Sequence, residues 1–253
     1  MKKTRPIPTL CLMLMTACGV ETTPPELRIA TDATFAPFHQ IDDSGRATGF
    51  DVELARAVAI HAGYEPAVVV LSYADLFAGL TTGTHDLVAA TTGITTERQK
   101  TYLFSVPYFT TCQVAVVRRG SSEPQTVADL AGKRIGASGT GTSFLAMQLI
   151  DGVHVSLNDG EGVSSLLNDS IDAWIVDEFD AVGAARESDG RLKVLAAGIA
   201  NENYGFVLAL GQSEIQSRIN GSLAVLEAEG VVADLQARFG VERAPGWPVQ
   251  CPD

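Results

Sequence analysis

Hydrophobic residues in the first hundred positions alternate between runs of strand length and stretches with helical spacing. Three apolar runs, at 27–31, 67–71 and 87–90, predict strands. Between them, apolar residues recur every three or four positions over 50–58 and 76–80, which predicts two helices. Strands that alternate with helices favour a mostly parallel sheet with helices on both faces.

A second series with the same alternation begins after Gly120. Apolar runs predict strands at 134–137, 153–157 and 173–176. Helical spacing between them predicts helices at 144–150 and 163–171. Two βα series of similar size predict two lobes.

The last part of the chain predicts an amphipathic helical pair over 215–239 that has no sheet of its own. The pair must therefore pack on a lobe that already exists. The simplest topology places 26–111 and 207–253 in the first lobe and 112–206 in the second.

Two crossing strands, expected at 113–117 and 204–208, join the lobes in this topology and act as a hinge. Ligands of open α/β sheets bind beyond the carboxyl ends of the strands. Those ends face the space between the lobes, so we expect the ligand site there.

The N-terminus predicts export. Three cations among the first five residues precede an apolar stretch at 10–15, and small residues precede Cys18. We expect residues 1–17 to be a lipoprotein signal peptide, Cys18 to carry the lipid and 18–26 to be a flexible tether. The apolar stretch is too short to span a bilayer. A simple cleaved signal is the alternative, because Met15 is unusual in a lipoprotein signal.

The charge of the chain argues against nucleic-acid binding. Its formal charge is −12, and removal of the three cations in residues 1–17 leaves 15 cations against 30 acidic residues, a net charge of −15. In an exported protein Cys112 and Cys251 are able to pair as a disulfide or to remain separate thiols. The sequence leaves both possibilities open, since it does not supply the distance that a bridge needs.

The clearest candidate for ligand binding is Arg98. It follows the apolar run at 87–90 and the small polar residues Thr91, Thr92 and Gly93. The planar guanidinium is able to hold both oxygens of a carboxylate, and small residues let backbone N–H groups approach the same anion. This chemistry suits an amino acid held by its carboxylate; a solvated arginine is the simpler alternative.

Motifs in a fixed order connect these features. They are 30–38 (ATDATFAPF), 49–51 (GFD), 76–83 with Asp86, 95–98 (TTER), 104–108 (FSVPY), 130–136 (LAGKRIG) and 172–178 (DAWIVDE). From about residue 27 to 240 the chain resembles the polar amino-acid-binding proteins of ABC importers, the extracellular solute-binding proteins of family 3. The resemblance implies an α/β, two-lobed periplasmic-binding-protein fold, with two parallel-type sheets, flanking helices and a two-strand hinge.

The resemblance also implies a set of ligand contacts. Phe35 would cover the aliphatic part of the ligand and Tyr73 would form the facing wall. Arg98 would bind the α-carboxylate together with Thr142 from the second lobe, and Asp177 would pair with the α-ammonium. A core role for either ring, or a surface role for the acid, is the plainer alternative.

One position departs from the family pattern. The resemblance places Ala90, Thr91 and Gly93 in the ligand-binding wall, but family members commonly have Ser or Thr where this chain has Gly93. The ammonium would lose a hydroxyl, and an unpaired buried polar group costs roughly 1–3 kcal/mol. We expect Thr91 to compensate; Thr92, a water or an unusual ligand are the alternatives.

Three other classes of protein are less consistent with the sequence. Cyclohexadienyl dehydratases resemble this family, and Asp177 or Glu178 would supply their acid, but Arg98 and the ammonium are expected to keep Asp177 ionised. A sensor module would need a partner for its output. The glycine-rich stretch 136–143 lacks the P-loop lysine, and the four histidines have no metal spacing. We expect no cofactor and no metal.

The sequence thus predicts an extracytoplasmic, lipid-anchored, monomeric binding protein that delivers a polar amino acid to an ABC permease without chemical change. Asp32 and Asp51 lie near the expected site, while no second cation is evident there. This balance favours neutral or cationic ligands over acidic ones.

Overall fold

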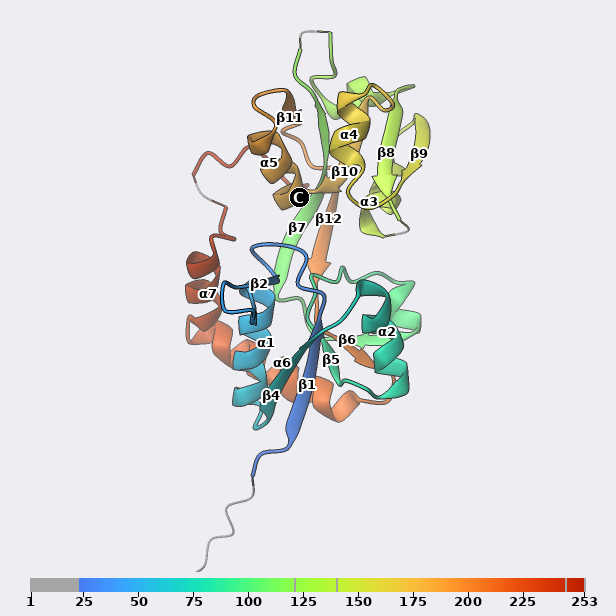
Figure 1. Cartoon of the computed structure of the whole chain (residues 1–253). Coiled ribbons are helices and arrows are strands. Elements are labelled where there is room, and N and C mark those ends of the chain that lie inside the picture. The colour runs from blue at the N-terminus through green and yellow to red at the C-terminus, as the bar shows by residue number, and fades with distance from the viewer. Residues whose placement is uncertain (1–22, 121, 140, 244, 253) are drawn as a thin grey trace, which may run out of the picture.

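Two sheets, each with its own helices, form two lobes joined by crossing strands in the computed structural model (Figure 1). The structure describes residues 23–120, 122–139, 141–243 and 245–252. The signal peptide, Cys18 and most of the expected tether lie outside the described residues. Among those described, no helix combines the length and apolarity needed to cross a membrane.

The first sheet has the strand order β4-β1-β5-β13-β6. Its strands are β1 (Glu26–Thr31), β4 (Glu65–Val70), β5 (Leu87–Val88), β6 (Tyr102–Phe104) and β13 (Val207–Ala209). Its helices are α1 (Phe50–His61), α2 (Tyr73–Thr82), α6 (Ser213–Ala228) and α7 (Val231–Phe239), with the short 3₁₀ helix η1 (Arg98–Lys100). A small ribbon of β2 (Gln40–Ile41) and β3 (Ala47–Thr48) precedes α1.

The second sheet has the order β11-β7-β10-β8-β9, and β12 also pairs with β7. Its strands are β7 (Phe109–Arg118), β8 (Arg134–Ser138), β9 (Val153–Leu157), β10 (Ala173–Asp177), β11 (Leu192–Val194) and β12 (Ala200–Tyr204). Its helices are α3 (Thr142–Met147), α4 (Gly162–Leu167) and α5 (Glu178–Glu187), with the 3₁₀ helix η2 (Val127–Leu130).

Inner strands such as β1, β5, β7 and β10 are buried on both faces, which explains why their sequences are nearly continuous apolar runs. Successive strand residues point to opposite faces. In β1, Ile29 packs in the cluster with α1 and α6, whereas Ala30 packs in the cluster with α2. In β7, Val116 and Val117 likewise belong to different clusters on the two faces of the second sheet.

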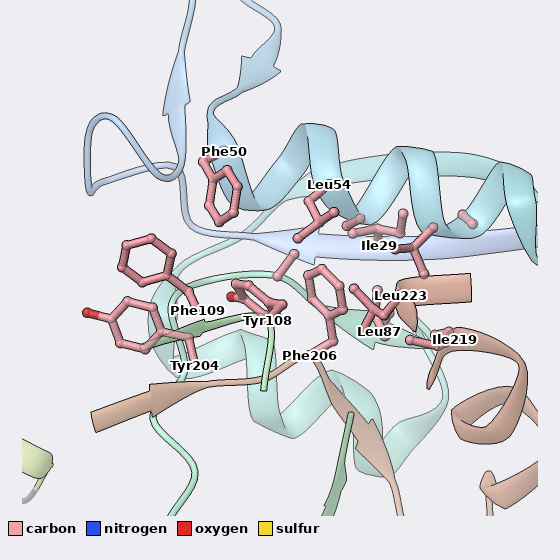
Figure 2. Close-up of a cluster of buried hydrophobic side chains, with 14 of the residues drawn as sticks. Ile29, Phe50, Leu54, Leu87, Tyr108, Phe109, Tyr204, Phe206, Ile219 and Leu223 are labelled. Atoms are coloured by element: carbon pink, nitrogen blue, oxygen red, sulfur yellow. The ribbon is translucent and has the colours of Figure 1, made fainter. Parts of the chain in front are cut away.

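Aromatic side chains fill the region where the lobes meet. Phe109 and Tyr204, from the two crossing strands, lie beside Phe50 in the largest cluster of the first lobe (Figure 2). The fully buried ring of Phe38 packs edge-on against Phe109, and also against Phe179 of α5, with centroids 5.2 and 5.1 Å apart. Because α5 belongs to the second sheet, this packing joins both lobes at the hinge.

The crossing strands differ from the prediction at one of their two positions. β7 includes the expected 113–117, but the expected strand at 204–208 is two strands, β12 and β13, separated by Gly205 and Phe206. The chain changes partners there, from β7 to β5 and β6. At Gly205 the backbone N–H donates to Thr92 O, and an added Cβ would lie 2.9 Å from Ile94. Close contact with the first lobe interrupts the strand.

The two-lobed α/β fold is as predicted, but both sheets are mixed rather than mostly parallel. β10, β11 and β12 all run antiparallel to β7, and β13 is antiparallel to its neighbours. The chain enters the second lobe through β7 and leaves through β12, so these strands must run in opposite directions. The helix α5, which the sequence analysis did not predict, begins directly after β10.

The C-terminal tail, described at residues 240–243 and 245–252, forms a third connection between the lobes. It was expected in the first lobe as part of 207–253, yet Trp247, Val249 and Cys251 pack in a cluster of the second sheet. Cys251 forms a disulfide with Cys112 of β7, which settles the choice the sequence left open. Arg243 forms an ion pair with the buried carboxylate of Glu178. The tail is therefore anchored on the second lobe after α7.

Replacing both Cys112 and Cys251 by Ser should lower the free energy of unfolding by roughly 2–5 kcal/mol, because the bridge restricts the unfolded chain over a separation of 139 residues. Urea unfolding of the oxidised protein and of the double variant measures the difference. Reduced wild type should unfold like the variant. Equal unfolding midpoints for oxidised wild type and variant would show that the bridge does not hold the tail.

Candidate functional site

Polar side chains gather on one face of the crossing strands. Glu202 of β12 is the cross-strand partner of Thr111, and Asp177 at the end of β10 is the partner of Gln113. Cross-strand partners lie on the same face of a sheet, and so do residues two apart in one strand. This pairing brings two acids, Asp177 and Glu202, to one face at the point where the lobes meet.

Asp177 is held by three hydrogen bonds from its own protein. Its Oδ2 accepts from Thr111 Oγ1 at 2.9 Å and from the Tyr204 hydroxyl at 2.5 Å. Its Oδ1 accepts from the backbone N–H of Phe179 at 2.8 Å and thereby caps α5. These bonds fix the carboxylate at the end of β10, where its side chain is almost fully buried.

The protonation of Asp177 in the protein without ligand is governed by its burial. Burial raises the pKa of Asp177 to about 8, and the nearby charge of Glu202 adds to that increase, while the three hydrogen bonds oppose it. Burial thus favours the protonated form of Asp177 in the protein without ligand. The expectation that Arg98 and a bound ammonium together keep Asp177 ionised concerns the liganded protein and stays a prediction.

Arg98 begins η1 in the first lobe and is oriented by its own loop. Its Nη1 donates to Gly93 O at 2.8 Å, and its backbone N–H donates to Thr95 Oγ1 at 3.2 Å. A Cβ added to Gly141, just before α3, would lie 3.8 Å from Nη2. The other edge of the guanidinium, which has no hydrogen-bond partner among the described residues, therefore faces the start of α3 in the second lobe.

Glu202 lies between the two segments that were expected to bind the ligand carboxylate. Its Oε1 accepts from Thr142 Oγ1 at 2.8 Å, and its Oε2 accepts from the side-chain amide of Gln113. On the other side, a Cβ added to Gly93 would lie 2.1 Å from Oε1 and 2.9 Å from Thr142 Cγ2. Burial raises the pKa of Glu202, while Thr142, Gln113 and Arg98 oppose the increase.

The backbone N–H and the hydroxyl of Thr91 both have partners within the first lobe. Its backbone N–H donates to Asp51 Oδ2 at 2.6 Å, and its hydroxyl lies 3.1 Å from His39 Nε2. Asp51 is fully buried, also accepts from the Tyr108 hydroxyl, and has its pKa raised to about 6 by burial. Thr91 itself adopts φ 41°, a conformation that this bond network holds. The hydroxyl of Thr91 thus already has one partner, His39, and the compensation by Thr91 stays a prediction.

The remaining predicted contacts fall into two groups. Tyr73, at the start of α2, is half exposed and lies close enough for the charges of Arg98 and Glu202 to act on its hydroxyl. Phe35 stacks on Phe38 with centroids 5.2 Å apart, in the aromatic region between the lobes. Ala90, in contrast, packs in the core with α2, so its side chain is structural.

Glu202 was missed by the sequence analysis. The predicted strand begins at Tyr204, so it does not include Glu202. The polar stretch Asn201-Glu202-Asn203 before an aromatic residue is the sequence feature that could have indicated a polar site here. Among the described residues, Cys112, Glu178 and Cys251 also converge in the manner of metal ligands. The disulfide removes both thiolates, so this cluster has a structural role.

The chain belongs to the bacterial extracellular solute-binding proteins of family 3, because the profile of that family matches residues 27–242. Members of this family bind solutes outside the cytoplasm. The chain is accordingly a solute-binding protein and not an enzyme.

Individual relatives agree with this assignment. The L-cystine-binding protein TcyJ of Escherichia coli K12 is 29% identical over 222 residues, covering 85% of this chain and 83% of TcyJ. The arginine-binding extracellular protein ArtP of Bacillus subtilis is 28% identical, covering 89% and 92%. The structure of ArtJ, an arginine-, lysine- and histidine-binding protein of Geobacillus stearothermophilus, has a TM-score of 0.74 at 28% identity, covering 86% and 96%.

Asp177→Asn should remove part of the pH dependence of stability. With a pKa of about 8 in the folded protein, Asp177 keeps a proton that the unfolded chain releases above about pH 4. Stability therefore falls as pH rises between these values, by up to about 1.4 kcal/mol per pH unit. Burial also raises the pKa of Asp51 and of Asp180 to about 6, so both contribute in the same direction up to about pH 7. They contribute equally to wild type and to Asp177→Asn, and the difference between the two slopes therefore reports Asp177.

Urea unfolding at pH 6, 7 and 8 measures this slope. Asp177→Asn should show a shallower decrease than wild type, whereas Asp234→Asn, at an exposed position on α7, should match wild type. Identical slopes for wild type and Asp177→Asn would mean that Asp177 is already ionised in the folded protein.

Proposed function

We propose that the protein captures a polar amino acid between its lobes and delivers it to an ABC permease. One observation carries this proposal. The guanidinium of Arg98 in the first lobe faces the segment of the second lobe that holds the Thr142 hydroxyl, and the buried acids Asp177 and Glu202 lie where the lobes meet. Arg98 supplies donors for a carboxylate, and so does the Thr142 hydroxyl when it exchanges its bond to Glu202 for one to the ligand. Asp177 and Glu202 supply acceptors for an ammonium. An amino-acid zwitterion needs both kinds of group within a short distance.

The free edge of Arg98 is suited to a carboxylate. Its Nη1 is already directed by Gly93 O, so the planar fork is held in one orientation before a ligand arrives. Such preorganisation lowers the entropy lost on binding. Tyr73 and Phe35 supply apolar surface near the polar groups, as expected for the side-chain part of a ligand.

The hinge gives the binding event a consequence for the shape of the protein. The segments that cross between lobes are 109–113 and 200–206, with the tail as a third connection. A ligand that contacts Arg98 in one lobe and Thr142 in the other binds the closed form better than the open form. It therefore shifts the population toward closure, which a permease is able to recognise.

The lipid anchor and the permease are supported by other observations. The N-terminal pattern that ends at Cys18 is typical of exported lipoproteins, and relatives of this family are amino-acid-binding proteins such as TcyJ and ArtP. We propose that residues 1–17 are removed and that Cys18 holds the protein at the membrane. Cystine, arginine and histidine, named for relatives, are the first ligands to test.

Arg98→Ala should weaken binding of any amino acid recognised by the wild type by roughly a hundredfold or more, because the carboxylate loses a charged, partly buried partner. The measurement is thermal shift against the common amino acids with protein lacking residues 1–18. A ligand at a hundredfold excess over its dissociation constant adds roughly 2.7 kcal/mol to wild-type stability.

Two variants make this test specific. Arg98→Lys keeps the charge but loses the fork, so it should bind with intermediate affinity. Lys100→Ala removes an exposed cation in the same 3₁₀ helix and should bind like wild type. Binding that survives Arg98→Ala would place the ligand elsewhere, and the absence of any amino-acid shift in wild type would contradict the proposed function.

A further inference from the structure

Glu202 has the features of a ligand-binding group whose partner is missing. Only 7% of the residue is exposed, and both carboxylate oxygens accept hydrogen bonds from neutral donors, Thr142 and Gln113. In the part of the chain that the structure describes, no ion pair joins Glu202 or Asp177 to a cation, whereas buried Glu178 has Arg243. Buried acids are normally paired with a cation or carry a proton.

Gly93 provides the space that the Glu202 carboxylate occupies. A Cβ at position 93 would overlap Oε1 at 2.1 Å and meet the carboxyl carbon at 3.1 Å. The backbone of Gly93 does not have a positive φ, so its conformation does not require glycine. A side chain at this position would therefore require Glu202 Oε1, and Thr142 Cγ2 at 2.9 Å, to move away.

The position of Glu202 is also the correct one for an ammonium group. It lies between the Arg98 loop, through Gly93, and Thr142, the two groups assigned to the ligand carboxylate. In an amino acid the ammonium and the carboxylate are attached to one carbon, so an acid beside the carboxylate site is within reach of the ammonium. Each oxygen of Glu202 accepts one hydrogen bond and keeps a second acceptor position.

Asp177 is less able to serve this purpose alone. Its Oδ2 already accepts two hydrogen bonds, and its Oδ1 caps α5. Thr91 is engaged with Asp51 and His39. Among the bonds of the described residues, each oxygen of Glu202 accepts one and keeps an acceptor position, whereas Asp177 keeps one on Oδ1 alone.

We propose that Glu202 binds the α-ammonium of the ligand, and that Gly93 is present because any larger side chain would displace this carboxylate. The inference rests on the proposed function and deepens it by assigning specificity for the ammonium to a hinge strand. Because β12 crosses between the lobes, the ammonium would then be bound at the hinge itself.

Isothermal titration of three amino acids and their analogues without the α-amino group tests the proposal. The pairs are L-arginine with 5-guanidinopentanoate, L-histidine with imidazolepropionate, and L-cystine with 3,3′-dithiodipropionate. Glu202→Gln should bind the amino acid roughly 10- to 100-fold more weakly than wild type, the loss expected for a hydrogen bond to a charged group. Binding of the corresponding analogue should change little, so the preference for the amino acid shrinks.

Two further variants separate this role from a structural one. Gly93→Ala should weaken amino-acid binding although Glu202 is intact, because the added Cβ meets Oε1. Glu227→Gln, at an exposed position on α6, should match wild type. Circular dichroism and melting temperature without ligand identify any variant that fails to fold, and Gly93→Ala then tests the same contact independently of Glu202→Gln.

Each outcome has a distinct meaning. Unchanged or tighter amino-acid binding by Glu202→Gln would overturn the proposal, since tighter binding would mean that Glu202 competes with the ligand carboxylate for Thr142. An equal loss for amino acid and analogue would also overturn it, because the ammonium would not be the group affected. If no amino acid binds wild type, the proposed function fails before Glu202 is tested.

Discussion

The pairing of β7 with β12 is the constraint on which the rest of the structure depends. This ladder continues the second sheet into the space between the lobes, and its register places Glu202 beside Thr111 and Tyr204 beside Phe109. One end of the ladder packs with Phe38 and Phe50 in the first lobe. A shift of one residue would turn Glu202 and Tyr204 to the opposite face and would separate Tyr204 from Asp177.

The same ladder explains why the site has an unusual charge balance. Asp177 and Glu202 are brought together in a buried region where the lobes meet, and the ring of Tyr204 there donates its hydroxyl to Asp177. Each acid has hydrogen-bond donors, but in the described residues neither contacts a cation, and the pKa of each is raised. A ligand that carries a positive group would relieve part of this cost. Burial thus makes the ligand-free site less favourable and increases the gain on binding.

Several residues of the proposed site were selected from the order of residues along the chain. Arg98 after a buried strand, Thr142 after a glycine-rich turn and Asp177 at a strand end were each recognisable, because strand ends and loops are local features. The sequence showed that Gly93 departs from the family pattern of Ser or Thr, but it did not show why a glycine stands there. The atom that excludes a side chain there belongs to Glu202, which is distant in the sequence and was placed outside the predicted strand.

Local patterning by itself determined the two βα series, the amphipathic final helices and the order of the motifs, because hydrophobic period and turn residues act over a few positions. Tertiary structure decided how acids, cations and cysteines are paired. The disulfide of Cys112 with Cys251, the protonation of Asp177 and the contact of Glu202 with Gly93 all depend on distances between remote segments and on the water removed between them. Those quantities exist only when the strands are paired and the lobes are packed.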